Sequence, residues 1–132
     1  MERPVASVEA LQAALGALRA GEVDAYFFVS DGMVVSQAQR IIDTARAQRV
    51  ATMCHEGSLV AQGGLASYGM SYYRAGHASA QYIQRILAGT NPKDLPVETV
   101  NKLDLVLNLL TAQQIGLTVP LSVLYQADKV IK

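Results

Sequence analysis

The chain has 132 residues, 51% of them hydrophobic and 17% charged, which is enough apolar material for the core of one domain. Its 11 basic residues balance its 11 acidic residues, so no basic stripe is available to neutralise the phosphates of a nucleic acid. The aromatic clusters Tyr26–Phe28 and Tyr72–Tyr73 are not interleaved with Lys or Arg, as single-strand binding would require. The single cysteine, Cys54, cannot form an internal disulfide, so the fold does not depend on oxidation.

Helix and strand patterns alternate along the first part of the chain. Ser7 is a typical N-cap, and the apolar residues that follow it up to Leu18 recur at helical spacing. The near-continuous apolar run Val23–Val29 predicts a strand that is buried on both faces, as in a parallel sheet. The polar turn Ser30-Asp31-Gly32 separates this strand from a second helix, whose apolar face runs from Val34 to Ala45.

Two more strands and the longest helix are expected in the middle of the chain. Strands are predicted over Val50–Cys54 and Leu65–Tyr68, with a helical turn over Ser58–Gln62 between them. The long helix is predicted over about Ser71–Leu87. In the tail, leucines alternate with more polar positions over 103–108, which predicts a strand with one wetter face. Thr111 is expected to cap a short helix that ends at Gly116, and Pro120 to begin the last helix.

This order of helices and strands predicts an α/β fold, a three-layer parallel sheet with helices on both faces. We expect a single lobe over residues 1–132. Its core would lie in residues 1–69, and residues 70–132 would supply a crossing helix, a strand and tail helices.

Patterns that would indicate catalysis or metal binding are missing from the sequence. It has neither a Gly-x-Gly-x-x-Gly loop nor a Gly-Lys-Ser/Thr ending, and the Gly64–Gly69 segment has the wrong spacing for a hydrolase elbow. Cys54 and His55 are neighbours on a strand, so they point to opposite faces and cannot work together as nucleophile and base. His55 and His77 stand apart, without the clustering that metal ligands need. We therefore predict no enzyme, no cofactor and no metal site.

Polar and aromatic residues gather where the predicted strands end. In open α/β sheets, ligands bind outside the carboxyl ends of the strands. The ends of the three predicted strands carry Ser30-Asp31, His55-Glu56 and Ser67-Tyr68 in turn. Two carboxylates and two hydroxyls at the carboxyl ends of the strands suit a ligand that carries an ammonium group. Tyr68 or Tyr72 would offer the face of its ring to that ligand.

Each of these residues also has a purely structural interpretation. An aspartate before a helix is often only an N-cap, which would explain Asp31. Glu56 before Gly57 fits a solvated turn, and Tyr72 at a helix start fits packing. Cys54 is typical of a small buried apolar residue.

Taken together, the segments resemble the substrate-binding components of ABC transporters. The strand that ends in Ser30-Asp31 matches a signature of that family, and Gly63–Gly69 followed by Tyr72-Tyr73 and Gly76 is similar to the branch that receives tryptophan and other aromatic amino acids. The resemblance continues to the end of the chain. It rests there on Ile86–Gly89, Pro92, Asp94–Glu98, Asn108, Thr111-Ala112, Ile115–Pro120 and Ala127–Ile131.

The resemblance implies a periplasmic-binding-protein-like (type I) lobe, one of two lobes that close on a ligand held in the cleft between them. It further implies that this sequence corresponds to the carboxyl-terminal half, without the opening strands of the first lobe and without the export signal. By the same resemblance Asp31 would take the ligand's ammonium group, Ser30 a hydrogen bond and Glu56 a second polar group. Tyr68 and, more weakly, Tyr72 would cover an apolar or aromatic part.

The implied partners are a small amino-acid-like ligand and a membrane permease, and the implied location is periplasmic or otherwise extracytoplasmic. The residues alone, with no signal segment before the first helix, would fit a cytoplasmic chain or one already stripped of its targeting segment.

A lobe without its sister lobe exposes apolar surface, so we expect a homodimer. The two copies could exchange the segments that follow the hinge Gly69-Met70-Ser71. The alternative is a monomer whose tail covers its own sheet.

Two other functions stay open at this point. A stand-alone sensory or regulatory domain could have kept the fold and lost transport. Signalling by phosphorylation on a flavodoxin-like sheet would need an acidic cluster, a phospho-accepting Asp and a Lys at the sheet mouth, and Asp31 and Glu56 offer only part of that set.

Overall fold

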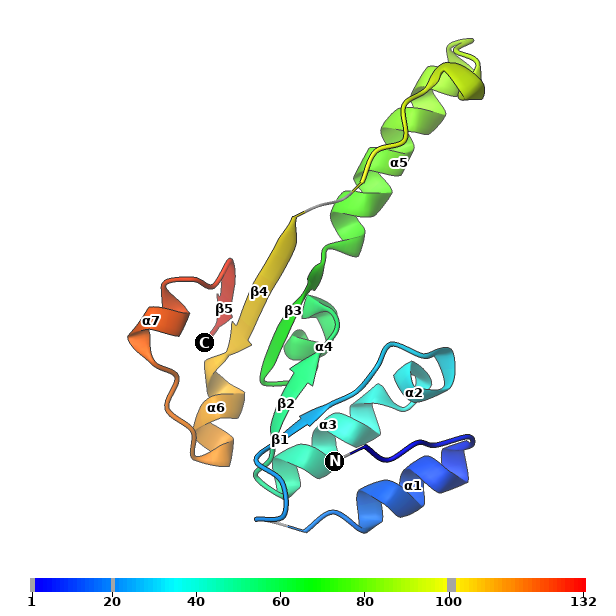
Figure 1. The fold of residues 1–132 in the computed structure, drawn as a ribbon. Helices are drawn as coiled ribbons and strands as arrows, with labels where there is room; N and C mark the ends of the chain where they lie inside the picture. The colour runs from blue at the N-terminus through cyan, green and yellow to red at the C-terminus, as the bar shows by residue number, and fades with distance from the viewer. Residues whose placement is uncertain (1, 20, 100–101) are drawn as a thin grey trace. The chain divides into compact units, whose positions relative to one another are not determined.

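A computed structural model describes residues 2–19, 21–99 and 102–132 (Figure 1). The chain divides into two compact units. The sheet unit comprises the residues up to Gly69 together with Asp104–Lys132, and the helical unit comprises Met70–Leu103. Residues 104–132 thus belong with the first 69 residues, whereas the sequence had suggested grouping them with the crossing helix.

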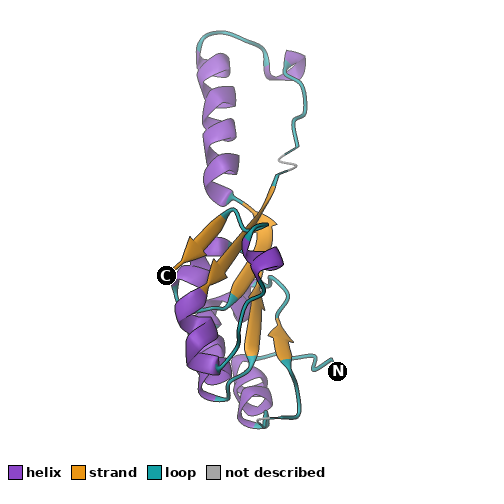
Figure 2. Ribbon diagram, turned by 90° about the vertical axis from the view of Figure 1, so that its left-hand side faces the viewer, coloured by secondary structure: helices purple, strands orange, loops and turns teal. Residues whose placement is uncertain are grey.

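Short helices and strands alternate along the sheet unit (Figure 2). Its helices are α1 (Val8–Gly16), α2 (Gly32–Ser36), α3 (Ala38–Ala47), α4 (Gly57–Ala61), α6 (Leu109–Ile115) and α7 (Leu121–Leu124). The strands are β1 (Ala25–Phe27), β2 (Ala51–Cys54), β3 (Ala66–Met70), β4 (Leu103–Asn108) and β5 (Lys129–Ile131). The helical unit holds α5 (Tyr72–Leu87) and the short 3-10 turn η1 (Pro92–Asp94).

Among the described residues the sheet has five strands in the order β1-β2-β3-β4-β5. β1, β2 and β3 are parallel neighbours, and so are β4 and β5. The arrows of β3 and β4 point in opposite directions in Figure 1, and the amide of Asn108 at the end of β4 donates to the carbonyl of Leu65 before β3. The sheet is therefore mostly parallel. The predicted parallel sheet is found for β1–β3 and for β4–β5, whereas β4 runs against β3 because the chain leaves the sheet after β3 and re-enters it at the same end.

Helices pack on both faces of the sheet, as the three-layer prediction requires. On one face, Cys54 of β2 lies in a cluster with Ile41 of α3 and Leu59 of α4. On the other face, Ala51 and Ala66 pack against residues of α6. Side chains alternate between the faces of a strand, so these two clusters lie on opposite sides. The α/β fold class is confirmed.

β1 differs from the strand that its sequence predicts. It is an edge strand of three residues and not a strand buried on both faces. Phe28, just after it, is buried in the core at 3% exposure, whereas Phe27 is 66% exposed. A strand at the edge of a sheet has a neighbour on one side only, so apolar sequence alone does not guarantee burial on both faces.

Most helix boundaries follow local signals. Ser7 caps α1 by accepting a hydrogen bond from the amide of Ala10, and Gly116 ends α6 in the left-handed conformation that favours glycine. The expected cap of α6 is wrong by three positions, because Asn108 and not Thr111 accepts the capping bond. β5 was not expected from the sequence, since its three residues form a strand only beside β4.

A buried network of hydrogen bonds joins the start of β3 to the end of β4. The side chain of Asn108 donates to the carbonyl of Val60 at 3.0 Å and accepts from the amide of Thr111 at 3.0 Å. The hydroxyl of Thr111 in turn donates to the carbonyl of Gly63. Asn108 is only 5% exposed, so its two side-chain bonds satisfy groups that water cannot reach.

We expect Asn108→Ala to lower the free energy of unfolding by about 2–4 kcal/mol, because it removes a helix cap and leaves a buried carbonyl without its donor. Urea unfolding followed by circular dichroism measures the difference. Asn91→Ala is the matched control, since Asn91 caps the exposed turn η1 through one bond to Lys93. Equal effects of the two substitutions would contradict a special role for Asn108.

Candidate ligand-binding site

The register of the parallel strands aligns their carboxyl ends. Phe27 pairs with Met53, and Cys54 pairs with Ser67. Each strand therefore ends at the same edge of the sheet, which we call the carboxyl edge. The residues expected at a ligand site follow from this register: Ser30 and Asp31 lie beyond β1, Glu56 lies beyond β2, and Tyr68 lies in β3 one residue past Ser67.

Asp31 caps α2. Its Oδ1 accepts hydrogen bonds from the amides of Met33 at 2.9 Å and Val34 at 3.4 Å. The structural interpretation of Asp31 as an N-cap is thus confirmed. Both bonds end on Oδ1, so the cap uses one of the two carboxylate oxygens, and the residue is exposed to solvent, as is Ser30 before it.

Glu56 is half-buried and stands at the N-cap position of α4. Its side chain makes no capping bond to the described amides of that helix. Instead, Oε1 accepts a hydrogen bond of 2.5 Å from the hydroxyl of Ser58. This short contact holds the carboxylate close to the start of α4 and limits the rotamers available to it.

Tyr68 presents an exposed ring at the carboxyl edge, with 57% of the residue accessible. The next residue, Gly69, allows β3 to approach β2 closely, because a Cβ there would overlap the carbonyl oxygen of His55. Any other residue at this position would push the two strand ends apart. Tyr72 is also 57% exposed, but it stands in the first turn of α5 and belongs to the helical unit.

From the sequence, His55 was considered as a catalytic base, as a metal ligand and as a polar residue at the end of a strand, and it stands at the same edge. It follows β2 directly, and its ring meets the ring of Phe28 edge-on at 5.9 Å between centroids. Its Nδ1 is buried and has no hydrogen-bond partner among the described residues. A pattern of residue types could not reveal this, because an unpartnered atom is a property of the packed structure.

The chemistry of the carboxyl edge is acidic and aromatic. Two carboxylates and two hydroxyls are typical partners of a ligand that carries an ammonium group, because charge-assisted hydrogen bonds are the stronger ones.

Within the described residues, no group of three His, Cys, Asp or Glu side chains could hold a metal ion. No helix in the described part of the chain combines the length and apolar character needed to cross a membrane.

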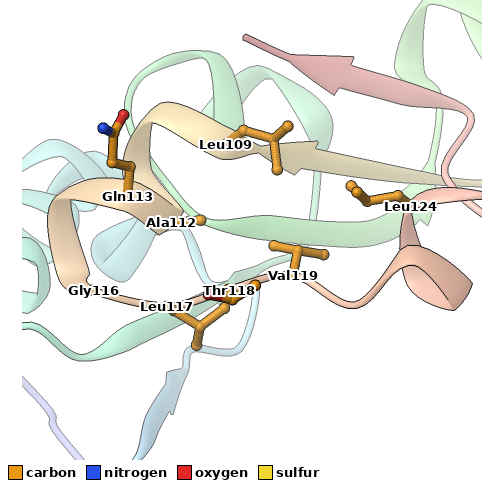
Figure 3. A pocket seen from close by; sticks show the side chains of 8 residues that line it. All are labelled: Leu109, Ala112, Gln113, Gly116, Leu117, Thr118, Val119 and Leu124. Atoms are coloured by element: carbon orange, nitrogen blue, oxygen red, sulfur yellow. The ribbon is translucent and has the colours of Figure 1, made fainter.

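An open hollow of about 490 Å³ lies elsewhere in the sheet unit, between α6 and the segment that leads to α7. Figure 3 shows the side chains of Leu109, Val119 and Leu124 turned toward a common space, with Gln113 pointing away. None of the described residues that line it is charged. This hollow therefore does not suit a ligand with charged groups, and it includes none of the residues that the sequence indicated.

Comparison with known proteins decides the family. The family described as "ABC transporter substrate binding protein" matches residues 2–131. This chain belongs to that family. The resemblance seen in the sequence is thereby confirmed, and the family consists of solute-binding proteins and not of enzymes.

Three known proteins are similar to the chain. A tyrosine-binding protein of Clostridioides difficile (strain R20291) is 22% identical over 108 residues, which cover 82% of this chain and 31% of that protein. A crystal structure of a conserved domain protein from Vibrio cholerae is 31% identical with a TM-score of 0.77 and covers 94% of this chain. A structure from Streptococcus pneumonia, described as an ABC domain in complex with L-Trp, is 27% identical with a TM-score of 0.75 and covers 93%. The chain spans 42% and 41% of those two structures, so it is less than half as long as they are.

Cys54 at this edge is expected to be chemically inert. The pKa of its thiol is raised to about 11, mainly by burial; a hydrogen bond with Thr52 opposes the shift, and the negative charge of Glu56 adds to it. Below about pH 9 the thiol is therefore protonated both in the folded chain and after unfolding. Between about pH 9 and 11 only the unfolded chain ionises, so the contribution of Cys54 to stability is lost as the pH rises through this window.

We predict that a thiol reagent at about pH 8 labels the native protein roughly a hundredfold more slowly than the urea-unfolded protein, because only the thiolate reacts. Absorbance of the released reagent measures both rates. Cys54→Ser should abolish labelling in both states. Labelling of the native protein at the rate of an exposed cysteine would contradict the burial of this thiol.

Proposed function

We propose that this chain is one lobe of an ABC transporter's receptor and that it binds an amino acid, aromatic or similar in shape, at the carboxyl edge. The observation that carries the proposal is the register of β1, β2 and β3, which brings an aspartate, a glutamate and a tyrosine to one edge of the sheet. Relatives described as tyrosine-binding or as a complex with L-Trp support this class of ligand.

Each residue in the proposed site has a defined role. Asp31 binds the ammonium group through the carboxylate oxygen that the α2 cap does not use. Ser30 exchanges a hydrogen bond with the ligand, and Glu56 binds a second polar group. Tyr68 covers the apolar or aromatic part with its exposed ring.

The ligand is proposed to lie in a cleft between this lobe and a second lobe of the receptor. The greater length of the relatives supports this, since the chain spans only 31–42% of the three described above. A closing cleft buries most of its ligand, so one lobe alone binds more weakly than two. In this proposal the receptor works outside the cytoplasm, delivers its ligand to a membrane permease and catalyses no reaction.

We predict that L-tryptophan or L-tyrosine raises the melting temperature of the protein, because a ligand that binds only the native state stabilises it. Asp31→Asn should weaken the binding by roughly ten- to a hundredfold, since it removes a charge-assisted bond of about 1.5–3 kcal/mol. Asparagine is as good an N-cap as aspartate, so α2 should keep its stability. Thermal-shift titrations with each amino acid measure both effects.

Asp24→Asn is the matched control, because Asp24 is an exposed aspartate at the amino end of β1, away from the carboxyl edge. It should leave the titration unchanged. Equal losses for Asp24→Asn and Asp31→Asn would indicate a general effect of charge and not a site at the carboxyl edge. No shift with any of the twenty amino acids would contradict the proposed ligand class.

We also propose that the chain forms a homodimer through α5, with or without exchange of the segments that follow Gly69. Every residue of α5 is described, and none of them is buried within the chain. Tyr73 and Leu87 are more than four-fifths exposed, and Ile83 is 57% exposed. A helix with this much exposed apolar surface gains free energy when a second copy covers it.

Light scattering at micromolar concentration should therefore give the mass of a dimer. The double substitution Ile83→Glu and Leu87→Glu places two charges on one stripe of α5 and should shift the mass to that of a monomer. Gln81→Glu, on another side of the same helix, should leave the dimer intact. A monomer mass for the unaltered chain would overturn the proposed pairing.

A further inference from the structure

Two buried side-chain atoms among the described residues lack a hydrogen-bond partner, and they belong to neighbouring positions of the sheet. They are Nδ1 of His55 and the hydroxyl oxygen of Ser67. Cys54 pairs with Ser67 in the register of β2 and β3, so His55 stands one residue past the partner of Ser67. A buried polar atom without a partner lowers stability, and groups of this kind concentrate where function requires them.

The surroundings of the two atoms differ. Ser67 is only 1% exposed, and its hydroxyl lies close to where a side chain on Gly57 would begin, inside the sheet unit. His55 is only partly buried, at the carboxyl edge beside Glu56. A ligand at that edge can therefore reach the imidazole of His55 but not the hydroxyl of Ser67.

The imidazole can exchange its buried and outer edges without moving the backbone. A half-turn about the bond between Cβ and Cγ exchanges Nδ1 with Cδ2 and Cε1 with Nε2, and it turns Nδ1 away from its buried position. The ring stays beside the buried ring of Phe28, which it meets edge-on at 5.9 Å between centroids.

We propose that His55 is a ligand-binding residue and that its Nδ1 accepts a hydrogen bond from an N–H or O–H donor of the bound amino acid. The inference rests on the proposed function of the carboxyl edge and adds to it a residue that discriminates between ligands. An acceptor at this place favours ligands that carry a donor near the aromatic part, such as an indole N–H or a phenol O–H. Phenylalanine, which has no such donor, is the ligand that His55 disfavours.

The proposal predicts opposite effects on stability and on binding. His55→Phe keeps an aromatic ring against Phe28 and removes the unpartnered nitrogen, so the melting temperature of the ligand-free protein should rise. The same substitution should weaken the binding of L-tryptophan or L-tyrosine by about tenfold and leave that of L-phenylalanine unchanged or stronger. His55→Asn keeps an acceptor near the position of Nδ1 and should retain more of the discrimination than His55→Phe.

Thermal unfolding without ligand and calorimetric titration with each of the three amino acids test this on the full chain. Ser67→Ala is the control, because it removes the other unpartnered atom and should raise the melting temperature without changing any titration. His55→Phe with unchanged discrimination would overturn the proposal, whether or not it stabilises the fold. If the unaltered chain binds none of the three amino acids, the proposed function itself fails, and the role of His55 fails with it.

Discussion

The fold of the sheet unit depends on Asn108, because this residue serves three segments at once. Its amide donates to Leu65, its side-chain nitrogen donates to Val60, and its side-chain oxygen caps α6. An asparagine can supply this combination because its side chain has a donor and an acceptor on one planar group. A leucine or an aspartate of similar size would leave at least one buried partner unsatisfied. The bonds hold the end of β4 beside the start of β3 and so complete the mixed order of the sheet.

β4 matters for the proposed site because it is the neighbour of β3, one of the three parallel strands that carry the site. β1, β2 and β3 end at one edge, and the residues proposed to bind the ligand stand where the chain turns from strand to helix. Two of these residues already have local partners: Asp31 caps α2, and Glu56 accepts from Ser58. Such contacts orient the carboxylates before any ligand arrives, which lowers the entropy lost on binding. A structural role and a binding role are therefore compatible in the same side chain.

Close packing at the same edge leaves little room for other residues. Gly69 is required where β3 meets the carbonyl of His55, and a Cβ at Gly64 would press against the sulfur of Cys54. The burial that results raises the pKa of the Cys54 thiol and leaves Nδ1 of His55 without a partner. The edge thus combines an inert cysteine with a histidine whose hydrogen-bonding capacity is unused within the described chain. The first property argues against thiol chemistry at this edge, and the second suits recognition of a ligand.

The amino-acid sequence by itself determined the local elements and the family. The cap at Ser7, the strand over Leu103–Asn108 and the glycine that ends α6 were all predicted within a residue or two, because caps and turn residues act on the backbone next to them. The series of motifs from the first strand to the tail indicated a substrate-binding protein, and the family match over residues 2–131 agrees with it.

Other features were decided only by the tertiary structure. An apolar run such as that of β1 does not distinguish a central strand from an edge strand, so the exposure of Phe27 could not be predicted from the sequence. The direction of β4 depends on where the chain re-enters the sheet, and the side-chain nitrogen of Asn108 donates to a carbonyl 48 residues away. The unpartnered nitrogen of His55 depends on every neighbour of that ring. Sequence patterns report on residues that are close along the chain, whereas burial, strand order and hydrogen-bond satisfaction are set by residues that meet only after folding.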